Sequence, residues 1–386
     1  MPLRPSARSR RIVQAEIRAM SLACEQLGGI NLAQGVMDTP APAAVCRGAQ
    51  EAIAQGVNSY TRYDGLAELR QAIARELLAY NRVAADPERE ITVTAGATGA
   101  FYAACLGLLD SGDEVVVFEP YYGYHVNTLL AVDARPVFVT LQPPDWTFRP
   151  EALEATVGPR TRAILVCTPA NPSGKVFTRE ELSWIAELAQ RHDLLVFTDE
   201  IYEHFVYDGR EHVSPASLPE LRERTVMISG FSKVFSITGW RIGYSVARPE
   251  LAEAIGYVSD LVYVCAPAPL QAGVAAALAE LGPEFYLGLR EQYQRKRERL
   301  CRALERAGLD PVVPQGSYYV LADASRVPGE TGKERAMYLL RWTGVAGVPG
   351  EAFFQGPEGH RWIRFCFAKR DEELDEACRR LETASL

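Results

Sequence analysis

The sequence lacks the patterns that mark several classes of protein. Its 49 acidic residues outnumber its 41 basic residues, giving a formal net charge of −8, whereas nucleic-acid-binding proteins normally carry a basic surplus. No apolar run approaches the ~18 residues that a membrane-spanning helix needs. The eight cysteines form no Cys-x-x-Cys pair and the five histidines show no metal-ligand spacing. We therefore expect a cytoplasmic protein with reduced thiols, without a metal site and without a membrane or nucleic-acid partner.

The first residues of the N-terminal segment include several arginines and no acidic residue before Glu16. It has no apolar core and no small-residue cleavage site, which excludes a secretory signal, although its arginines leave a transit peptide as an alternative. We expect an exposed arm that leads into a helix around Ile12 to Leu27. The arginines that precede the first acidic residue, Glu16, are Arg4, Arg8, Arg10 and Arg11.

Seven short apolar runs rich in β-branched residues lie between about residues 90 and 250. Amphipathic stretches such as Phe101–Leu109 and Arg179–Arg191 alternate with them, and Thr178 is placed to cap the second. The runs are Ile91–Thr94, Val115–Phe118, Val137–Val139, Ala163–Cys167, Leu194–Thr198, Val226–Ser229 and Ile242–Ala247. This alternation predicts an α/β fold with a mostly parallel, seven-stranded sheet covered on both faces. Ligands of such sheets bind beyond the carboxyl ends of the strands.

The pattern changes after about residue 282, where long charged and short apolar segments follow one another. We predict a large domain, 46–281, and a smaller α+β domain formed by 1–45 and 282–386. The expected elements of the C-terminal part are a helix over Glu284–Ala307, strands near Tyr318–Asp323, Val345–Val348 and Ile363–Phe367, and a helix over Asp371–Leu381.

The first strand ends before a turn of small residues, Gly96, Ala97 and Thr98, that opens a helix. Free backbone N–H groups at a helix N-terminus can approach a phosphate, and the helix dipole favours the anion. A tight turn without a ligand is the alternative, because glycine punctuates many loops.

Three later strands are followed by side chains that could bind a ligand or take part in a reaction. Tyr122 could stack on a planar ring, or it could be an ordinary tyrosine at the rim of the sheet. Asn171 lies between two prolines and presents a rigid amide. Asp199 follows a buried strand, where a carboxylate needs a nearby cation unless it caps the next helix. Tyr202 comes three residues later.

Lysine is scarce, with five lysines against 36 arginines. One of them, Lys233, lies among apolar and small residues directly after the strand Val226–Ser229. A lysine that is kept from water has a lowered pKa and becomes an amine nucleophile or general base, which can attack a carbonyl carbon. Arg241, eight residues later, offers a fork to a phosphate.

Together these residues describe a site for a planar, phosphorylated ring with an aldehyde and a basic nitrogen. Lys233 would take the aldehyde, while Arg241 and the turn at Gly96 would take the phosphate. Asp199 would pair with the protonated ring nitrogen. Pyridoxal 5′-phosphate meets these requirements. The remaining ring contacts would come from Tyr122 by stacking and from Asn171 and Tyr202 by hydrogen bonding.

From about residue 28 to 381 the sequence resembles the class I/II aminotransferases of the aspartate aminotransferase superfamily, fold type I among pyridoxal-phosphate enzymes. The most specific motif is Ser232-Lys233 followed by Gly239-x-Arg241-x-Gly243. The supporting motifs are Asn171-Pro172-Ser173-Gly174, Asp199-Glu200-Ile201-Tyr202 and Ile363-Arg364-Phe365. The segment around Arg364 is most similar to the branch of kynurenine, glutamine and methionine aminotransferases.

The resemblance implies further roles that spacing does not show. Arg364 would bind the α-carboxylate of the substrate, with Gly35 as a backbone donor and Asn171 beside them. Tyr60 would reach the cofactor phosphate of the partner subunit, which implies a homodimer with shared active sites.

One position departs from the family pattern. Gly230 stands where the family often has a phosphate-binding serine, three residues before Lys233. Ser232 and Thr98 are the candidates to supply hydroxyl contacts in its place.

The implied function is transfer of an amino group from an L-amino acid, neutral or aromatic, to a 2-oxo acid by a ping-pong mechanism. Lys233 would be the catalytic residue, acting as base and then as acid. A carbon–sulfur β-lyase on the same cofactor is the alternative, because it uses the same residues. Of the five histidines, only His125, near Tyr122, is expected to touch the substrate.

Overall fold

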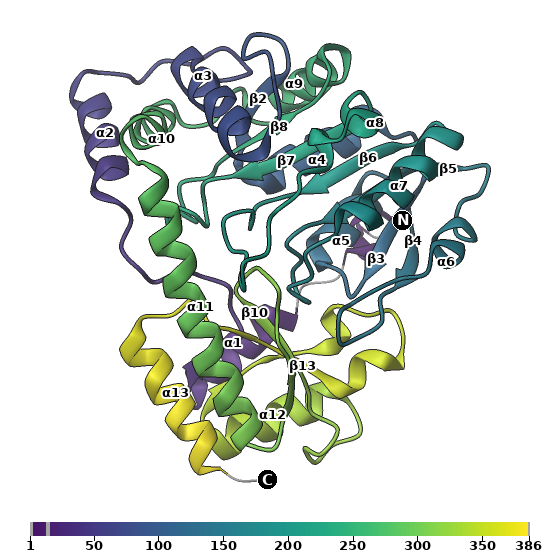
Figure 1. Cartoon of the computed structure of the whole chain (residues 1–386), viewed down its shortest axis with the longest axis vertical. Helices are drawn as coiled ribbons and strands as arrows, with labels where there is room; N and C mark the ends of the chain where they lie inside the picture. The colour runs from purple at the N-terminus through teal and green to yellow at the C-terminus, as the bar shows by residue number, and fades with distance from the viewer. Residues whose placement is uncertain (1–2, 13–15, 385–386) are drawn as a thin grey trace.

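The computed structural model describes residues 3–12 and 16–384, and its upper part in Figure 1 is built on a seven-stranded sheet. The strands lie in the order β2–β8–β7–β6–β5–β3–β4. They are β2 (Ile91–Ala95), β3 (Glu114–Glu119), β4 (Arg135–Thr140), β5 (Thr161–Cys167), β6 (Leu195–Asp199), β7 (Thr225–Gly230) and β8 (Ile242–Val246). Only β8 runs against its neighbours. The predicted α/β fold with a mostly parallel seven-stranded sheet is confirmed.

Helices cover both faces of this sheet because its strands are apolar on both sides. Along β3, Val115 and Val117 pack into the core under α4, α5 and α9, while Val116 and Phe118 pack into the core under α7. This alternation follows from the two-residue period of a strand. The helices of this part are α2 (Ala43–Ala54), α3 (Ala67–Glu76), the π-helical turn η2 (Leu77–Asn81), α4 (Gly96–Leu108), α5 (Gly123–Ala131), α6 (Pro150–Glu154), α7 (Arg179–Arg191), η3 (Pro215–Ser217), α8 (Pro219–Arg222), α9 (Pro249–Tyr263) and α10 (Ala268–Glu280).

A second sheet lies in the lower part of Figure 1, and the long helix α11 (Pro283–Arg306) runs from one part to the other. Its antiparallel strands lie in the order β12 (Val348–Pro349), β13 (Trp362–Cys366), β10 (Tyr319–Asp323) and β9 (Asp310–Val312). The N-terminal β1 (Ile30–Asn31) pairs in parallel with β11 (Val345–Ala346). The helices here are α1 (Glu16–Gln26), α12 (Gly332–Thr343), η4 (Gly350–Ala352), η5 (Pro357–Arg361) and α13 (Asp371–Thr383), whereas the N-terminal η1 (Ser9–Arg11) lies against α5 in the upper part, where Arg8 and Arg11 pair with Asp133. The domain boundaries at 45/46 and 281/282 stay a prediction.

Three elements differ from the sequence prediction. The single strand expected over Val345–Val348 is two short strands, β11 and β12, in different sheets. The helix expected over Phe101–Leu109 begins earlier, at Gly96, because α4 follows β2 directly. The N-terminal helix is observed over Glu16–Gln26, and residues 13–15 of the predicted range lie outside the described residues.

None of the helices in the described ranges is long and apolar enough to cross a membrane.

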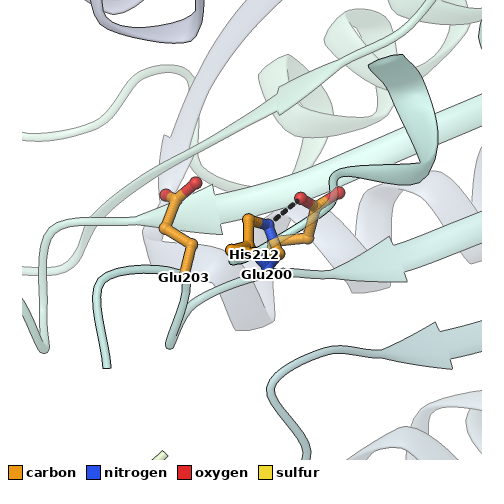
Figure 2. A group of neighbouring side chains, drawn as sticks. All are labelled: Glu200, Glu203 and His212. Carbon is orange, nitrogen blue, oxygen red and sulfur yellow. Dashed lines mark hydrogen bonds and ion pairs between the residues drawn. The ribbon is translucent and has the colours of Figure 1, made fainter. Parts of the chain in front are cut away.

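A buried group of acid and base side chains lies beside the carboxyl ends of β6 and β7 (Figure 2). The Glu200 carboxylate accepts hydrogen bonds from Thr198 at 2.6 Å and from Ser214 at 3.0 Å, and His212 Nε2 lies 2.8 Å from its other oxygen. The Glu203 carboxylate accepts from Asn81 at 2.6 Å and from Ser229 Oγ at 2.9 Å. The group therefore joins β6, β7 and the turn η2.

The same group has the residue types of a metal site, but its geometry is that of a closed hydrogen-bond network. Ligand atoms of Glu200, Glu203 and His212 all lie within 4.8 Å of one another. Each carboxylate oxygen already has a partner within the chain. A metal ion would have to displace those partners, because its ligands must direct free lone pairs at one centre.

Glu203 should make the stability of the protein depend on pH. Burial raises the pKa of its carboxyl to about 7, from 4.5. The unfolded chain releases this proton at lower pH than the folded chain, so the free energy of unfolding should fall as pH rises from about 4.5 to 7. Glu203→Gln keeps the shape and should remove up to about 3 kcal/mol of this fall.

Urea unfolding of wild type and Glu203→Gln between pH 5 and 8 measures the effect. Glu187→Gln, at an exposed position on α7, is the matched control and should follow wild type. Parallel pH profiles for wild type and Glu203→Gln would contradict the shifted pKa.

Candidate active site

A cavity of about 410 Å³ lies between the carboxyl ends of β5 and β6, the loop after β7 and the second sheet. Most of the residues singled out in the sequence line it, although the first and last of them, Gly35 and Arg364, are 329 positions apart. They are Gly35, Ala97, Thr98, Tyr122, Asn171, Asp199, Tyr202, Ser232, Lys233, Arg241 and Arg364. His125 lines it as well.

Two of the singled-out residues are not part of the lining. Gly96 lies directly behind it, against the guanidinium of Arg241. Tyr60 is 81% exposed and lies outside the cavity of its own chain.

Lys233 follows β7 by three residues and its amine faces the cavity without a carboxylate partner among the described residues. Its Nζ donates a hydrogen bond to the carbonyl of Gly35 at 3.4 Å and lies 5.8 Å from the ring centre of Tyr318. Desolvation lowers the pKa of this amine to about 8, and the positive charges of Arg241 and Arg364 act in the same direction. The other four lysines pair with acids: Lys175 with Glu181, Lys296 with Asp371, Lys333 with Glu16, and Lys369 with Asp38 and Glu373.

The start of α4 packs directly against the start of β8. Gly96 has a φ of +74°, and a Cβ on it would collide with Arg241. A Cβ on Gly243 would collide with the backbone of Gly96 and Ala97. This contact leaves the first N–H groups of the 13-residue helix facing the cavity, next to the Arg241 guanidinium, which is held by the carbonyl of Thr238 at 2.9 Å. The arrangement can hold a dianionic phosphate.

The departure at Gly230 has a steric cause in the close pairing of β7 with β8. A Cβ on Gly230 would lie 2.9 Å from Gly243 Cα and 3.1 Å from the carbonyl oxygen of Ile242. A serine there would require the two strands to separate. Ser232 and Thr98 line the cavity instead.

Asp199 ends β6, and its two oxygens have different partners. Oδ2 lies 2.8 Å from His125 Nε2, and Oδ1 accepts the backbone N–H of Ile201 at 3.2 Å. His125 is buried. Its ring lies edge-on to the rings of Tyr122 and Phe101, with distances between ring centres of 5.2 Å and 4.9 Å. Asp199 therefore makes a local turn contact and a contact with His125, while its pairing with the cofactor ring stays a prediction. The His125–Asp199 pair was not expected, and no local sequence signal links residues 74 positions apart.

Arg364 reaches the cavity from β13 with its guanidinium plane fixed. It donates to Asn171 Oδ1 at 2.8 Å and to the carbonyl of Ala33 at 2.7 Å. Its guanidinium carbon lies 4.1 Å from the ring centre of Tyr319 and 4.8 Å from that of Phe353. A fixed arginine fork of this kind can bind a carboxylate.

Tyr318 and Tyr319, which the sequence prediction missed, complete the side of the cavity at Arg364. The hydroxyl of Tyr319 lies 3.3 Å from that of Tyr202. A Cβ on Gly35 would collide with the Tyr319 hydroxyl. Tyr318 donates to the carbonyl of Gly35 at 3.1 Å. Gly35 is thus required by close approach to Tyr319. The only sequence signal was a tyrosine pair at the start of an apolar strand.

Comparisons with known proteins agree with this geometry. The sequence profile of the family "Aminotransferase class I and II" matches residues 28–381. A probable N-succinyldiaminopimelate aminotransferase of Mycobacterium tuberculosis is 37% identical, over 94% of each chain. Kynurenine–oxoglutarate transaminase 3 of Rattus norvegicus is 35% identical, over 90% of this chain and 83% of its own.

The fold of the chain also matches solved structures. A solved Escherichia coli structure, described as having a methionine aminotransferase function, superposes with a TM-score of 0.95 and 33% identity, covering 99% of this chain and 100% of its own. These relatives do not favour the carbon–sulfur β-lyase alternative. The family's cofactor is pyridoxal 5′-phosphate, and the glycine-lined turn beside Arg241, the carboxylate of Asp199 and the unpaired Lys233 fit its phosphate, ring nitrogen and aldehyde. The chain belongs to the class I and II aminotransferases and is a pyridoxal-phosphate-dependent amino acid aminotransferase.

Proposed function

We propose that the cavity at Lys233 is the transamination site of this aminotransferase. The observation that carries the proposal is the position of Lys233: the one lysine without an acidic partner among the described residues shares a cavity with Arg364. When bound, pyridoxal phosphate supplies a carbon that accepts the amino group and a ring that withdraws electrons.

Lys233 has the environment of a proton-transfer group. With a pKa of about 8, roughly one amine in ten is neutral at pH 7, whereas an ordinary lysine is almost fully charged. The neutral amine would hold the aldehyde of the cofactor until the amino group of the substrate replaces it. The released amine would then take the proton from Cα of the amino acid, and as an ammonium it would act as the proton donor.

The other residues in and directly behind the lining would bind and orient the cofactor and the substrate. Arg241, Ser232, Thr98 and the N–H groups at Gly96 and Ala97 hold the phosphate. Asp199, positioned by His125, holds a proton on the ring nitrogen. Tyr122 stacks on the ring, and Asn171 and Tyr202 bond its oxygen. Arg364, with Gly35 and Asn171, binds the α-carboxylate.

The substrates are an L-amino acid with a neutral or aromatic side chain at the cavity and a 2-oxo acid. Apolar and aromatic side chains that carry none of the roles above line the cavity, among them Ile17, Val36 and Tyr124. Two of the three named relatives, whose names refer to kynurenine and methionine, support this class, while the third is named for N-succinyldiaminopimelate.

A homodimer with shared active sites would cover the exposed apolar residues near Tyr60. The ring of Tyr63 lies 5.6 Å from that of Tyr257 on α9, which brings the segment of Tyr60 next to this helix. Leu261, at the end of α9, is 85% exposed. Exposed patches of this kind mark interfaces.

We also place the protein in the cytoplasm. Five of its eight cysteines are buried as free thiols, and burial raises the pKa of Cys105. Such thiols are typical of a reducing compartment.

Lys233→Ala tests the proposal directly. Transamination should fall by between about a hundredfold and ten-thousandfold, because nucleophile and proton carrier are lost together. In the wild type freed of cofactor, the rate of pyridoxal phosphate uptake should rise about fivefold from pH 7 to 8, because the neutral amine reacts and a pKa of about 8 leaves roughly a tenth of it neutral at pH 7 and half at pH 8. Stopped-flow absorbance measures both. Full turnover by the variant would overturn the assignment.

Gly243→Ala tests the phosphate site. The added methyl group would collide with the backbone at the start of α4, so cofactor affinity should fall by at least about tenfold. Gly239→Ala is the matched control in the same motif, because a Cβ there meets nothing within 4 Å. Equal Kd values for the two variants in a fluorescence titration would contradict the role.

Tyr60→Ala tests the shared site. Mixing subunits that carry Tyr60→Ala with subunits that carry Lys233→Ala would give hybrids in which one site has both native residues. At limiting cofactor we expect roughly a quarter of wild-type activity to return if half of the dimers are hybrids. No recovery, with mixed dimers verified by native mass spectrometry, would place Tyr60 in its own subunit's site or in none.

A further inference from the structure

Tyr319 lies between two parts of the active site and carries none of the roles proposed above. It is buried in the wall of the cavity, at the start of β10. Its hydroxyl lies 3.3 Å from the hydroxyl of Tyr202, and the guanidinium carbon of Arg364 lies 4.1 Å from the centre of its ring. One side chain therefore contacts both the proposed partner of the cofactor's ring oxygen and the proposed partner of the α-carboxylate.

The surrounding backbone fixes the ring of Tyr319 in this position. Leu321 lies opposite Arg364 in the pairing of β10 with β13, and side chains two positions apart share a face of the sheet. Tyr319 is thus the diagonal neighbour of Arg364 on that face, with the flat guanidinium over its ring. The backbone of Gly35 closes the space beside the hydroxyl, because a Cβ there would overlap the hydroxyl. The ring cannot turn away without losing its contact with the guanidinium, so its hydroxyl stays directed at Tyr202.

The proposed contact of Tyr202 with the cofactor decides which of the two hydroxyls donates. Burial raises the pKa of both phenols, so each keeps its proton at neutral pH. A phenol has one proton to donate. Tyr202 gives its proton to the ring oxygen in the proposed site, and its oxygen is then left to accept from Tyr319. Hydrogen bonds in series strengthen one another, so the separation of 3.3 Å, which is long for two hydroxyls, should shorten when the ring oxygen is bound.

We propose that Tyr319 is a positioning residue that acts on the cofactor through Tyr202. Its hydroxyl donates to Tyr202 and so strengthens the hydrogen bond that Tyr202 donates to the ring oxygen, which favours the anionic form of that oxygen. Arg364 contributes by holding the ring of Tyr319 in place. This inference rests on the proposed function and deepens it, because it needs the assigned contact of Tyr202 with the ring oxygen.

Tyr319→Phe removes the hydroxyl and keeps the ring beside Arg364. In a fluorescence titration of the cofactor-free protein, the Kd of pyridoxal phosphate should rise about three- to tenfold, since one hydrogen bond of the series is lost. The pKa of the pH-dependent absorbance of the holoenzyme should rise by about 0.5 to 1, because the anionic ring oxygen is less stabilised. KM for an amino acid donor should stay within about twofold, because Arg364 keeps the ring that supports it.

Two comparisons separate an effect through Tyr202 from a purely structural role of Tyr319. In a Tyr202→Phe background, Tyr319→Phe should have no further effect on the Kd, because the hydroxyl through which it acts is gone. In addition, 3-deoxypyridoxal phosphate, which lacks the ring oxygen, should bind equally to wild type and Tyr319→Phe. A loss of packing at Tyr319 would weaken binding in all of these cases alike.

Tyr293→Phe is the matched control. Tyr293 is a buried tyrosine of α11 whose ring centre lies 6.2 Å from that of Tyr318, and it is outside the cavity lining. Loss of its hydroxyl should leave the Kd, the KM and the pKa of the absorbance change as in the wild type.

The outcomes separate the inference from the proposed function. An unchanged Kd in Tyr319→Phe, or the same loss with and without the Tyr202 hydroxyl, would overturn the role of Tyr319 while the transamination site stands. Wild-type affinity in Tyr202→Phe would refute the contact of Tyr202 with the ring oxygen, and the inference with it. Failure of the proposed site as a whole would instead appear as full turnover by Lys233→Ala.

Discussion

An amine that is kept from water without a counter-charge is the constraint on which the active site depends. A carboxylate bonded to Lys233 would compensate its burial but would also hold its proton. The chain instead places Arg241 and Arg364 in the same cavity, and their charges act with desolvation to lower the pKa of Lys233. Asp199, the nearest acid of the cavity, is directed to His125. Desolvation is the largest of these effects, and it outweighs the negative charge of Asp199, which acts to raise the pKa of the amine.

The fold can hold the uncompensated amine of Lys233 because other contacts keep the surrounding strand ends in place. The ends of β6 and β7 are joined by the buried network of Glu200 and Glu203, whose oxygens are all satisfied. At the neighbouring strand, glycines let β8 and α4 approach to backbone contact. Unfavourable polar burial at the site is therefore flanked by two buried carboxylates whose oxygens all have partners, a condition that favours a preorganised site.

Much of this was predictable from the sequence, for physical reasons that can be named. The seven apolar runs form the seven-stranded sheet because strands buried on both faces are nearly continuous in apolar residues. Lys233 and Asp199 could be singled out because each follows such a strand, and the carboxyl ends of parallel strands meet at one edge. Membership of the aminotransferase family followed from motifs around the same residues.

What escaped prediction depends on contacts between distant segments. The short strands β11 and β12 have too few residues to show a period, and they join different sheets on either side of Gly347. The pairing of His125 with Asp199 and of Glu203 with Asn81 leaves no local pattern. The contacts of Tyr319 with Tyr202 and Arg364 are likewise a product of tertiary packing, since the three residues come from β10, from the turn after β6 and from β13.

The carbonyl of Gly35 accepts hydrogen bonds from both Lys233 and Tyr318. A carbonyl oxygen can accept from an ammonium and from a neutral amine alike, whereas a carboxylate would bind the ammonium far more strongly. The lysine can therefore change its protonation state while the same atom continues to orient it. In the proposed transamination, the carbonyl of Gly35 would thus orient the Lys233 amine in both protonation states, so that the side chain could serve in turn as base and acid from one position.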